Sequence, residues 1–262
     1  MNRQIPQTLV GAVLAAVAIF SSSCRKEIDY LNRFGNGQPD CKACAIRDIT
    51  VLHSSEVGED TVVYSFTYNR AGDPLTVMNT AVKTGNPNAV FKYDKWGRLA
   101  ELVRPYANQA FETWTKYVYN DRNQVIRDTQ FIFGSYLDSV PAPFPQAGFS
   151  VSQFGYDAQD RIIATTDSFF TPGGQPFGTG SVYQYDANGN LIVPGVLYDS
   201  RLSILRTNKI WMFVCRNYSV DNGFIAARYN AHGFPLIFQT SNEILAPIVP
   251  AAGGFQVRYA CN

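Results

Sequence analysis

The stretch Tyr93-Asp94-Lys95-Trp96-Gly97-Arg98-Leu99 decides the fold that we predict, because variants of it recur along the chain. The tyrosine ends a run in which apolar and polar residues alternate, which is typical of a half-buried strand. Asp94 takes the first turn position, where its carboxylate can accept hydrogen bonds from backbone N–H groups two residues on. Gly97 suits the left-handed conformation that closes a hairpin loop. Leu99 begins the returning strand, so the stretch predicts a β-hairpin.

Five further stretches repeat this order of residue types, beginning at Tyr68, Tyr119, Tyr156, Tyr185 and Tyr229. Asp157, Asp186 and Gly189 occupy the same turn positions in two of these copies. Asn123 and Asp160 replace the glycine in two copies, and these residue types tolerate a positive φ best. The chain therefore predicts an all-β protein, an antiparallel meander of repeated β-hairpins that forms a curled sheet, an open barrel or a partial shell.

The motif Tyr-Asp-x-x-Gly-Arg/Asn-Leu, matched best at 93–99 and 185–191, resembles that of the YD-repeat (Rhs-like) family. Looser copies extend the resemblance from about Ile46 to about Ser241. The resemblance implies β-hairpin repeats that build long curling sheets or shells, commonly in secreted or surface proteins that bind carbohydrate or protein. It implies no catalytic residue.

The N-terminus has the pattern of a bacterial lipoprotein signal peptide, predicted over residues 1–23. Arg3 supplies positive charge, and the apolar run 10–20 is too short to span a membrane. Small residues then lead to Cys24, as in a lipobox, which predicts Cys24 as the lipidated first residue of the mature protein. A plain secretory signal with an incidental cysteine is the alternative. Residues 24–40 are predicted to be a tether and residues 41–262 a single repeat domain, placed at the outer membrane on the cell surface or the periplasmic face.

Four more cysteines are candidates for disulfides, namely Cys41, Cys44, Cys215 and Cys261. An even number of thiols permits full pairing in an oxidising compartment, although the spacing leaves the connectivity open. A metal site at the first two cysteines is the alternative. Cys261, beside the C-terminus, is well placed to join the last strand to the first.

Alternating runs predict strands over 46–52, 61–68, 89–93, 99–104, 111–119, 124–133, 181–185, 210–220, 224–229 and 254–260. Residues 54–60 are predicted to be a polar loop. Three prolines in Pro141-Ala142-Pro143-Phe144-Pro145 exclude a central strand and predict an exposed loop, with a lobe boundary near 138–150. No segment keeps a helical period over three turns.

No stretch of the sequence predicts catalysis. Only two histidines are present, and His-Glu-x-x-His, Gly-x-Ser-x-Gly and phosphate-binding glycine loops are absent. Asp94, Asp157 and Asp186 are turn residues, so we predict no enzymatic activity, no cofactor and no metal. Removing residues 1–23 deletes one of 22 basic residues, leaving 21 basic and 21 acidic residues, a balance that argues against nucleic acid as a partner.

Three tryptophans are candidates for a sugar-binding aromatic surface: Trp96 within a turn, and Trp114 and Trp211 within predicted strands. Core packing is the alternative for the two in strands. The expected function is a lipid-anchored, non-catalytic binding or adhesion module with carbohydrate as its ligand. The alternative is a periplasmic structural lipoprotein that binds other envelope proteins through exposed strand edges. The sequence predicts no oligomeric state.

Overall fold

The computed structural model describes residues 44–55, 58–223, 226–238, 245, 247–250 and 254–261. The predicted signal peptide, Cys24, the tether and Cys41 lie outside these residues. The unit that begins at Cys44 is therefore the part of the chain to which every structural statement below refers.

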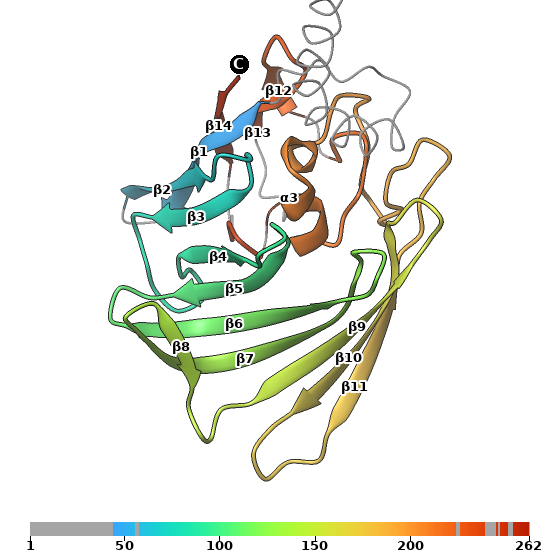
Figure 1. The fold of residues 1–262 in the computed structure, drawn as a ribbon. Helices are drawn as coiled ribbons and strands as arrows, with labels where there is room; N and C mark the ends of the chain where they lie inside the picture. Colours follow the sequence, from blue (N-terminus) through green and yellow to red (C-terminus); the bar gives the residue numbers. More distant parts are fainter. Residues whose placement is uncertain are drawn as a thin grey trace, which may run out of the picture. The chain divides into compact units, whose positions relative to one another are not determined.

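The predicted all-β class is confirmed, because the described residues form one antiparallel sheet of fourteen strands (Figure 1). In chain order the strands are β1 (Ala45–Ser55), β2 (Gly58–Tyr68), β3 (Pro74–Asn79), β4 (Ala89–Tyr93), β5 (Leu99–Pro105), β6 (Ala110–Tyr119), β7 (Val125–Leu137), β8 (Val140–Pro143), β9 (Phe149–Tyr156), β10 (Ile162–Phe170), β11 (Phe177–Val182), β12 (Ala226–Tyr229), β13 (Pro235–Phe238) and β14 (Phe255–Ala260). Their order across the sheet is β11-β10-β9-β7-β6-β5-β4-β3-β2-β1-β14-β13-β12. The sheet curls without closing.

The last strand lies beside the first. Strand β14 pairs antiparallel with β1, so the N-terminal strand of the domain has a neighbour on each side. A disulfide between Cys44 and Cys261 joins the outer ends of these two strands. This is the link between first and last strand that the position of Cys261 predicts. The disulfide lies directly beside the pairing of β1 with β14, which it holds together covalently.

A short helical segment lies within the curl of the sheet, where we predicted a strand over 210–220 (Figure 1). It consists of η1 (Ile204–Thr207) and α3 (Lys209–Val214), and that strand prediction is wrong. Asn208 starts α3, because its side-chain oxygen accepts a hydrogen bond from the Ile210 N–H at 2.8 Å. A short run that is apolar at every position does not distinguish a buried strand from a buried helix.

Trp211 anchors this helix in the core. Its side chain is 0% exposed, and the rings of Phe66 and Phe91 meet it edge to face at centroid distances of 5.6 and 5.5 Å. Phe66 and Phe91 come from β2 and β4, so one indole ties the helix to this half of the sheet. Aromatic contacts of this kind add about 1 kcal/mol each to the burial of the rings.

The proline-rich stretch is not a loop at a lobe boundary. Residues 140–143 form β8, which pairs only with the end of β7, outside the main strand order. An edge position of this kind tolerates prolines, since their missing N–H groups are not needed by a second neighbour. The sheet continues directly from β7 to β9, so no boundary near 138–150 divides it. The predicted loop 54–60 is also shorter than expected, because β1 and β2 pair as far as Ser55 and Gly58.

Candidate functional site

The repeat turns share one hydrogen-bonding pattern. The side-chain oxygen of the first turn residue accepts from the backbone N–H groups two and four residues on, at 2.8–3.0 Å, in all six copies: Asn69, Asp94, Asn120, Asp157, Asp186 and Asn230. Gly97 and Gly189 have positive φ values of 76° and 84°, and Asn123 and Asp160 have 61° and 60°. The turn carboxylates therefore bind their own backbone and hold the hairpins in shape.

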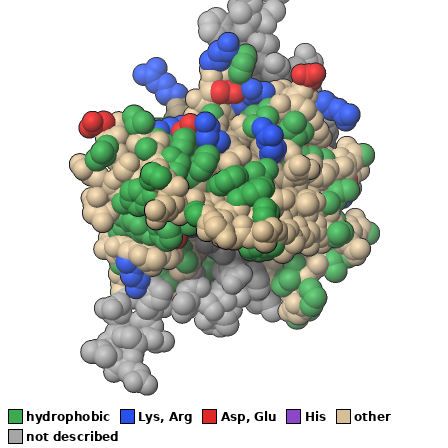
Figure 2. Space-filling view, turned by 90° about the horizontal axis from the view of Figure 1, so that it is seen from below, with side chains coloured by type: hydrophobic (Ala, Val, Ile, Leu, Met, Phe, Trp, Pro, Cys, Tyr) green, Lys and Arg blue, Asp and Glu red, His purple; other side chains and the backbone are tan. Residues whose placement is uncertain are grey.

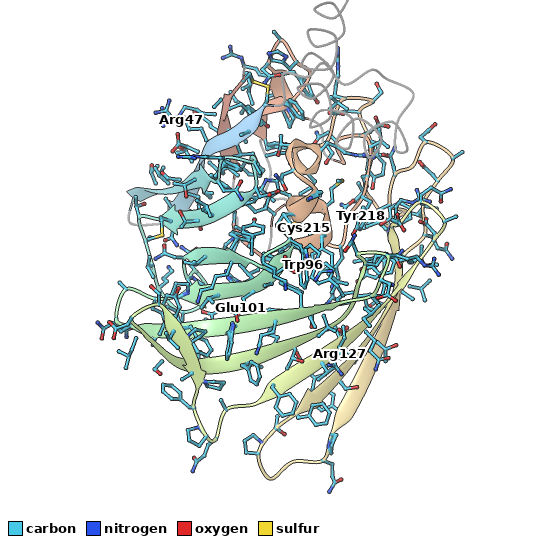
Figure 3. The ribbon with its side chains drawn as sticks, viewed as in Figure 1. Arg47, Trp96, Glu101, Arg127, Cys215 and Tyr218 are labelled. Atoms are coloured by element: carbon cyan, nitrogen blue, oxygen red, sulfur yellow. A yellow bond between two sulfur atoms is a disulfide. The ribbon has the colours of Figure 1, made fainter. Side chains whose placement is uncertain are left out.

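The three tryptophans do not form one surface. Trp96 is 67% exposed in its turn, with the Lys95 ammonium 4.4 Å and the Arg98 guanidinium 4.7 Å from its ring (Figure 3). Trp114 is half-buried on β6, tilted against Phe131 at a centroid distance of 5.1 Å. Trp211 is buried in α3, so the expectation that it exposes one face of a strand is wrong.

Cys215 has a free thiol, so the disulfide predicted at this residue is not formed. It caps the C-terminal end of α3, whereas the disulfide that does form lies at the outer ends of β1 and β14. Burial raises the pKa of the Cys215 thiol to about 12, and the thiol therefore stays protonated at neutral pH. A protonated thiol is a poor nucleophile and a poor metal ligand.

One cluster of residues has the spacing of a metal site. The ligand atoms of Cys44, His232 and Cys261 lie within 4.8 Å of one another. Both sulfur atoms are shared in the disulfide, however, and thiolates are the form of cysteine that binds metals. The cluster in this oxidised state therefore offers a metal only the imidazole.

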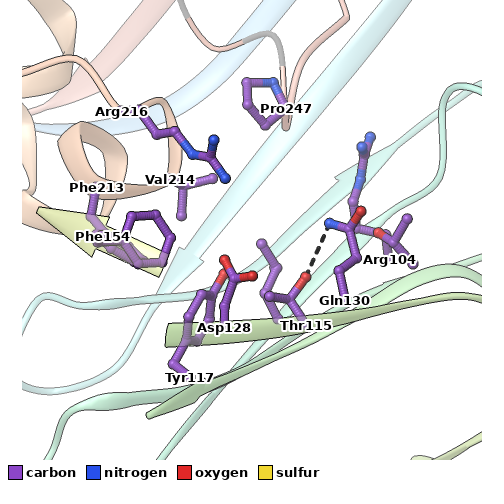
Figure 4. A pocket seen from close by; sticks show the side chains of 12 residues that line it. Arg104, Thr115, Tyr117, Asp128, Gln130, Phe154, Phe213, Val214, Arg216 and Pro247 are labelled. Carbon is purple, nitrogen blue, oxygen red and sulfur yellow. Dashed lines mark hydrogen bonds between the residues drawn. The ribbon is translucent and has the colours of Figure 1, made fainter. Parts of the chain in front are cut away.

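A cavity of about 190 Å³ lies on the concave face of the sheet, between strands β5, β6, β7 and β9 and the end of α3 (Figure 4). Tyr117 and Asp128 line the cavity and are paired across β6 and β7. The same row continues beside the cavity, where Asp128 is paired with Ser152 and Ser152 with Asp167. Residues paired directly across adjacent strands point to the same face. A row of polar side chains therefore crosses the concave face. The aromatic rings of Phe154 and Phe213 form one wall of the cavity.

Arg216 lies over this row. The residue follows α3 with a φ of 50°, and its Nη2 is 3.6 Å from Asp167 Oδ1 and 3.4 Å from Ser152 Oγ. The guanidinium also lies 5.3 Å from the centre of the Phe154 ring. Burial lowers the pKa of the Arg216 guanidinium, whereas Tyr183, Asp167 and Asp128 raise it. The raising effects are larger together, so the pKa lies above its usual value. Arg216 is therefore a fixed positive charge.

Asp128 is the titratable group of the cavity. It is 7% exposed, and this burial raises the pKa of its carboxyl to about 6, although Arg216 and Ser152 act in the opposite direction. Its protonation state therefore changes between about pH 5 and pH 7. A carboxyl with a raised pKa inside a cavity is a common feature of binding and catalytic sites.

Polar and cationic groups continue along the cavity beyond Asp128. Gln130 Nε2 donates a hydrogen bond to Thr115 Oγ1 at 3.2 Å, and Arg104 lies beyond this pair (Figure 4). Burial lowers the pKa of Arg104, while Glu112, Tyr64 and Tyr106 oppose that effect. The arrangement combines hydroxyl, amide, carboxyl and guanidinium groups with two aromatic rings, which is chemistry suited to a polyhydroxylated ligand.

Sequence reasoning singled out none of Arg104, Asp128 and Arg216. The available signal is that β6 and β9 carry polar residues at alternate positions on one face, as in Thr113-Thr115 and Ser150-Ser152. A polar face of a strand is ordinarily exposed to solvent. Only the path of the chain around α3 shows that one of these polar faces lines a cavity.

The comparisons with known proteins are sparse. No protein-family model matches this sequence. No curated protein matches it either. Two matching crystal structures are those of TcdB2-TccC3-Cdc42 and TcdB2-TccC3, with 11% and 12% identity and TM-scores of 0.29 and 0.30. Each match covers 73% of this chain and 10% of the other, so this chain spans about a tenth of their length. A likeness at this level carries no argument about function.

Proposed function

We propose that this chain is a non-catalytic binding module of the bacterial cell envelope, built of hairpins of the YD-repeat type, that binds carbohydrate in the concave cavity. The observation that carries the proposal is the lining of that cavity. Asp128, Gln130 and Thr115 offer donors and acceptors, beside the rings of Phe154 and Phe213. Sugar hydroxyls hydrogen-bond to planar polar groups, while the C–H faces of the ring stack on aromatic side chains.

The size of the cavity fits one sugar ring. Its volume of about 190 Å³ holds several water molecules, which a single pyranose would displace. We therefore propose the inside of the curl as the ligand contact, in preference to the tryptophan surface expected from the sequence. Trp96 remains exposed at a turn and supplies a comparison site.

The non-catalytic part of the proposal rests on how the carboxylates are engaged. Asp128 and Asp167 share one row of the concave face, with β9 between their strands, so their backbones are about 10 Å apart. Glycoside hydrolysis by inversion needs a water molecule held between two such groups. Here Ser152 lies between the two aspartates, where that water molecule would be held. Arg216 Nη2 contacts the Ser152 hydroxyl and lies 3.6 Å from Asp167 Oδ1.

Binding is tested with the full chain carrying Cys24→Ser, which removes the predicted lipidation site. A panel of mono- and oligosaccharides is titrated calorimetrically against this chain, the variants Asp128→Asn and Phe154→Ala, and the control Trp96→Ala. We expect a ligand whose affinity falls at least tenfold in both cavity variants and stays unchanged in the control. Loss of binding in Trp96→Ala alone would move the site to that turn. Hydrolysis of a glycan, abolished by Asp128→Asn, would replace the binding module with an enzyme.

The proposed location has its own test. Neither helix among the described residues is long and apolar enough to cross a bilayer. The proposal assigns the membrane anchor to the lipid predicted on Cys24, at the outer membrane. Protease treatment of intact cells, with lysed cells as the control, distinguishes the cell surface from the periplasmic face. Release of a Cys24→Ser variant into the soluble fraction is the expected result in either case.

One observation favours a second candidate, a scaffold for envelope proteins. All six residues of β11 are exposed, and the strand pairs with β10 in continuous register without a bulge. It carries no charge and no proline, the features by which edge strands ordinarily avoid further pairing. Hydrophobic side chains appear on the face shown in Figure 2. Separately, Phe177 of β11 is 57% exposed.

In-cell crosslinking from position 180 tests this second candidate. Discrete crosslinked products that disappear in Thr179→Lys would support a partner strand at this edge, because a charge on an edge strand opposes pairing. A crosslinking pattern that is the same in Thr179→Lys would exclude pairing along β11.

A further inference from the structure

Arg104 differs from every other charged group of the cavity in having unused hydrogen-bond donors. Its side chain leaves β5 and lines the end of the cavity opposite Arg216 (Figure 4). Its Nε and Nη2 atoms are both buried, and neither has a hydrogen-bond partner among the described residues. A buried donor without a partner destabilises the folded state, and more so when it is charged. Such a cost is retained at sites where a ligand supplies the missing acceptor.

The chain has a carboxylate near Arg104 but does not use it as a partner. Glu112 is the first of the groups that raise the pKa of Arg104 against the effect of burial. Its Oε2 instead accepts hydrogen bonds from the Gly85 N–H and the Tyr106 hydroxyl, each at 2.7 Å. No ion pair within 4.0 Å joins Arg104 to a described carboxylate. Within the described part of the chain, the positive charge of Arg104 therefore has no carboxylate at contact range.

The two unused donors have a specific geometry. Nε and Nη2 lie on the same edge of the planar guanidinium, with their N–H bonds roughly parallel. Two parallel N–H groups match the two oxygens of a carboxylate, which forms a bidentate pair with arginine. The other end of the cavity is different, since Arg216 already has Asp167 and Ser152 beside it. The cavity thus has one end suited to an anionic group and a middle suited to hydroxyls.

We infer that the cavity binds an acidic sugar, a uronic acid, whose carboxylate pairs with Nε and Nη2 of Arg104 while its hydroxyls reach Thr115, Gln130 and Asp128. The inference rests on the proposed carbohydrate function and names the class of sugar. Binding turns the guanidinium about its side-chain torsions, so that the edge that is buried in the free protein faces the cavity. Arg104 then gains the acceptors that the fold does not supply.

The test compares acidic with neutral sugars on the full chain carrying Cys24→Ser. Galacturonate and glucuronate, with their short oligomers, are titrated beside galactose and glucose. We expect the acidic sugars to bind at least tenfold more tightly, and Arg104→Met to remove that preference. Arg104→Lys keeps the positive charge but lacks the planar pair of donors. This variant should retain only part of the preference for acidic sugars. Arg127→Met is the matched control, because Arg127 is exposed and adjacent to Asp128 on the opposite face of β7 (Figure 3).

The outcomes separate this inference from the proposed function. Equal affinity for acidic and neutral sugars would overturn the inference and leave the proposed function in place. Absence of binding to any sugar would overturn both. Equal competition by inorganic sulfate or phosphate would show a general anion site and overturn the assignment to uronic acids. If Arg104→Met fails to fold, the comparison of sugars on the unaltered cavity, together with Arg104→Lys, still decides the matter.

Discussion

The hydroxyl of Tyr119 donates a hydrogen bond to the backbone carbonyl of Leu99 at 2.8 Å. Leu99 is the residue paired with Tyr93 across the preceding hairpin, and Tyr93 in turn donates to the carbonyl of Pro74 at 2.7 Å. Pro74 is paired with Tyr68, the tyrosine of the hairpin before that. Tyr93 and Tyr119 therefore each hold the start of the returning strand in the hairpin before their own.

This tyrosine ladder, defined by Tyr68, Tyr93, Tyr119, Tyr156, Tyr185 and Tyr259, runs along the sheet. Turn arginines reinforce it: the Arg98 guanidinium lies 4.4 Å from the Tyr119 ring, and that of Arg161 lies 4.1 Å from the Tyr185 ring. Tyr229 departs from the ladder, because its hydroxyl donates to Asp199 instead. The recurrence of tyrosine thus reflects contacts between successive hairpins as well as the shape of each one.

Removing one hydroxyl from the ladder should destabilise the domain. We expect Tyr119→Phe to lower the free energy of unfolding by about 1–2 kcal/mol, because the Leu99 carbonyl loses its partner. Tyr185→Phe is the matched comparison, since its bond to the Ile162 carbonyl is longer, at 3.4 Å, and its loss should cost less. Urea unfolding measures both. A larger loss for Tyr185→Phe would show that the hydroxyl bonds do not carry the effect.

The repeat turn depends on a left-handed residue at its fourth position. Gly97→Ala should lower the free energy of unfolding by about 1–2 kcal/mol, because a non-glycine residue at a φ of 76° is strained. No atom lies within 4 Å of the added methyl group, so the cost is one of backbone conformation alone. Gly180→Ala in β11 is the control, with no positive φ and its nearest atom at 3.5 Å. Equal effects of the two substitutions in thermal unfolding would contradict this account.

The bond between Cys44 and Cys261 closes a loop of 217 residues in sequence. Cys44→Ser should lower the free energy of unfolding by about 3–5 kcal/mol, because a long loop in the unfolded chain is no longer constrained. Cys215→Ser is the control, since the free thiol of Cys215 takes part in no such link. Reduction with dithiothreitol should reproduce the effect of Cys44→Ser. An unfolding midpoint that is insensitive to reduction would rule out this role for the disulfide.

Asp128 should make stability depend on pH. Its carboxyl has a pKa of about 6 in the folded protein, mainly through burial, against about 4 in an unfolded chain. The folded state therefore binds more protons between these values, and its stability falls as pH rises from about 4 to about 7. The contribution is complete at low pH and is lost as pH rises through 6, with a size on the order of 2–3 kcal/mol.

Urea unfolding of the unaltered chain and of Asp128→Asn, from pH 4 to pH 8, measures this contribution as the difference between the two curves. Asp121→Asn is the control, because Asp121 is exposed in a turn. A difference that does not change with pH would mean that Asp128 titrates normally in the folded protein.

The hairpins were predictable because their determinants are local. A turn depends on an oxygen, two nearby N–H groups and one left-handed residue, all within five positions of Asp94 or Asp157. Strand β4 coincides with the predicted range 89–93, and β5 and β6 differ from the predicted ranges by one residue at one end. Segment 204–214 was missed because its helical form depends on burial within the curl, around Trp211.

The sequence by itself determined the class of fold, the turn chemistry and the tyrosine that begins each turn, because neighbours along the chain carry these features. Only the tertiary structure decided which polar faces are buried. Arg216 is 88 residues beyond Asp128 in sequence, and Arg104 precedes Asp128 by 24, yet all three line one cavity. They meet because the sheet curls around α3 and because strand pairing aligns Tyr117, Asp128, Ser152 and Asp167 on one face. Contacts between distant segments of this kind leave no pattern at any fixed spacing along the chain.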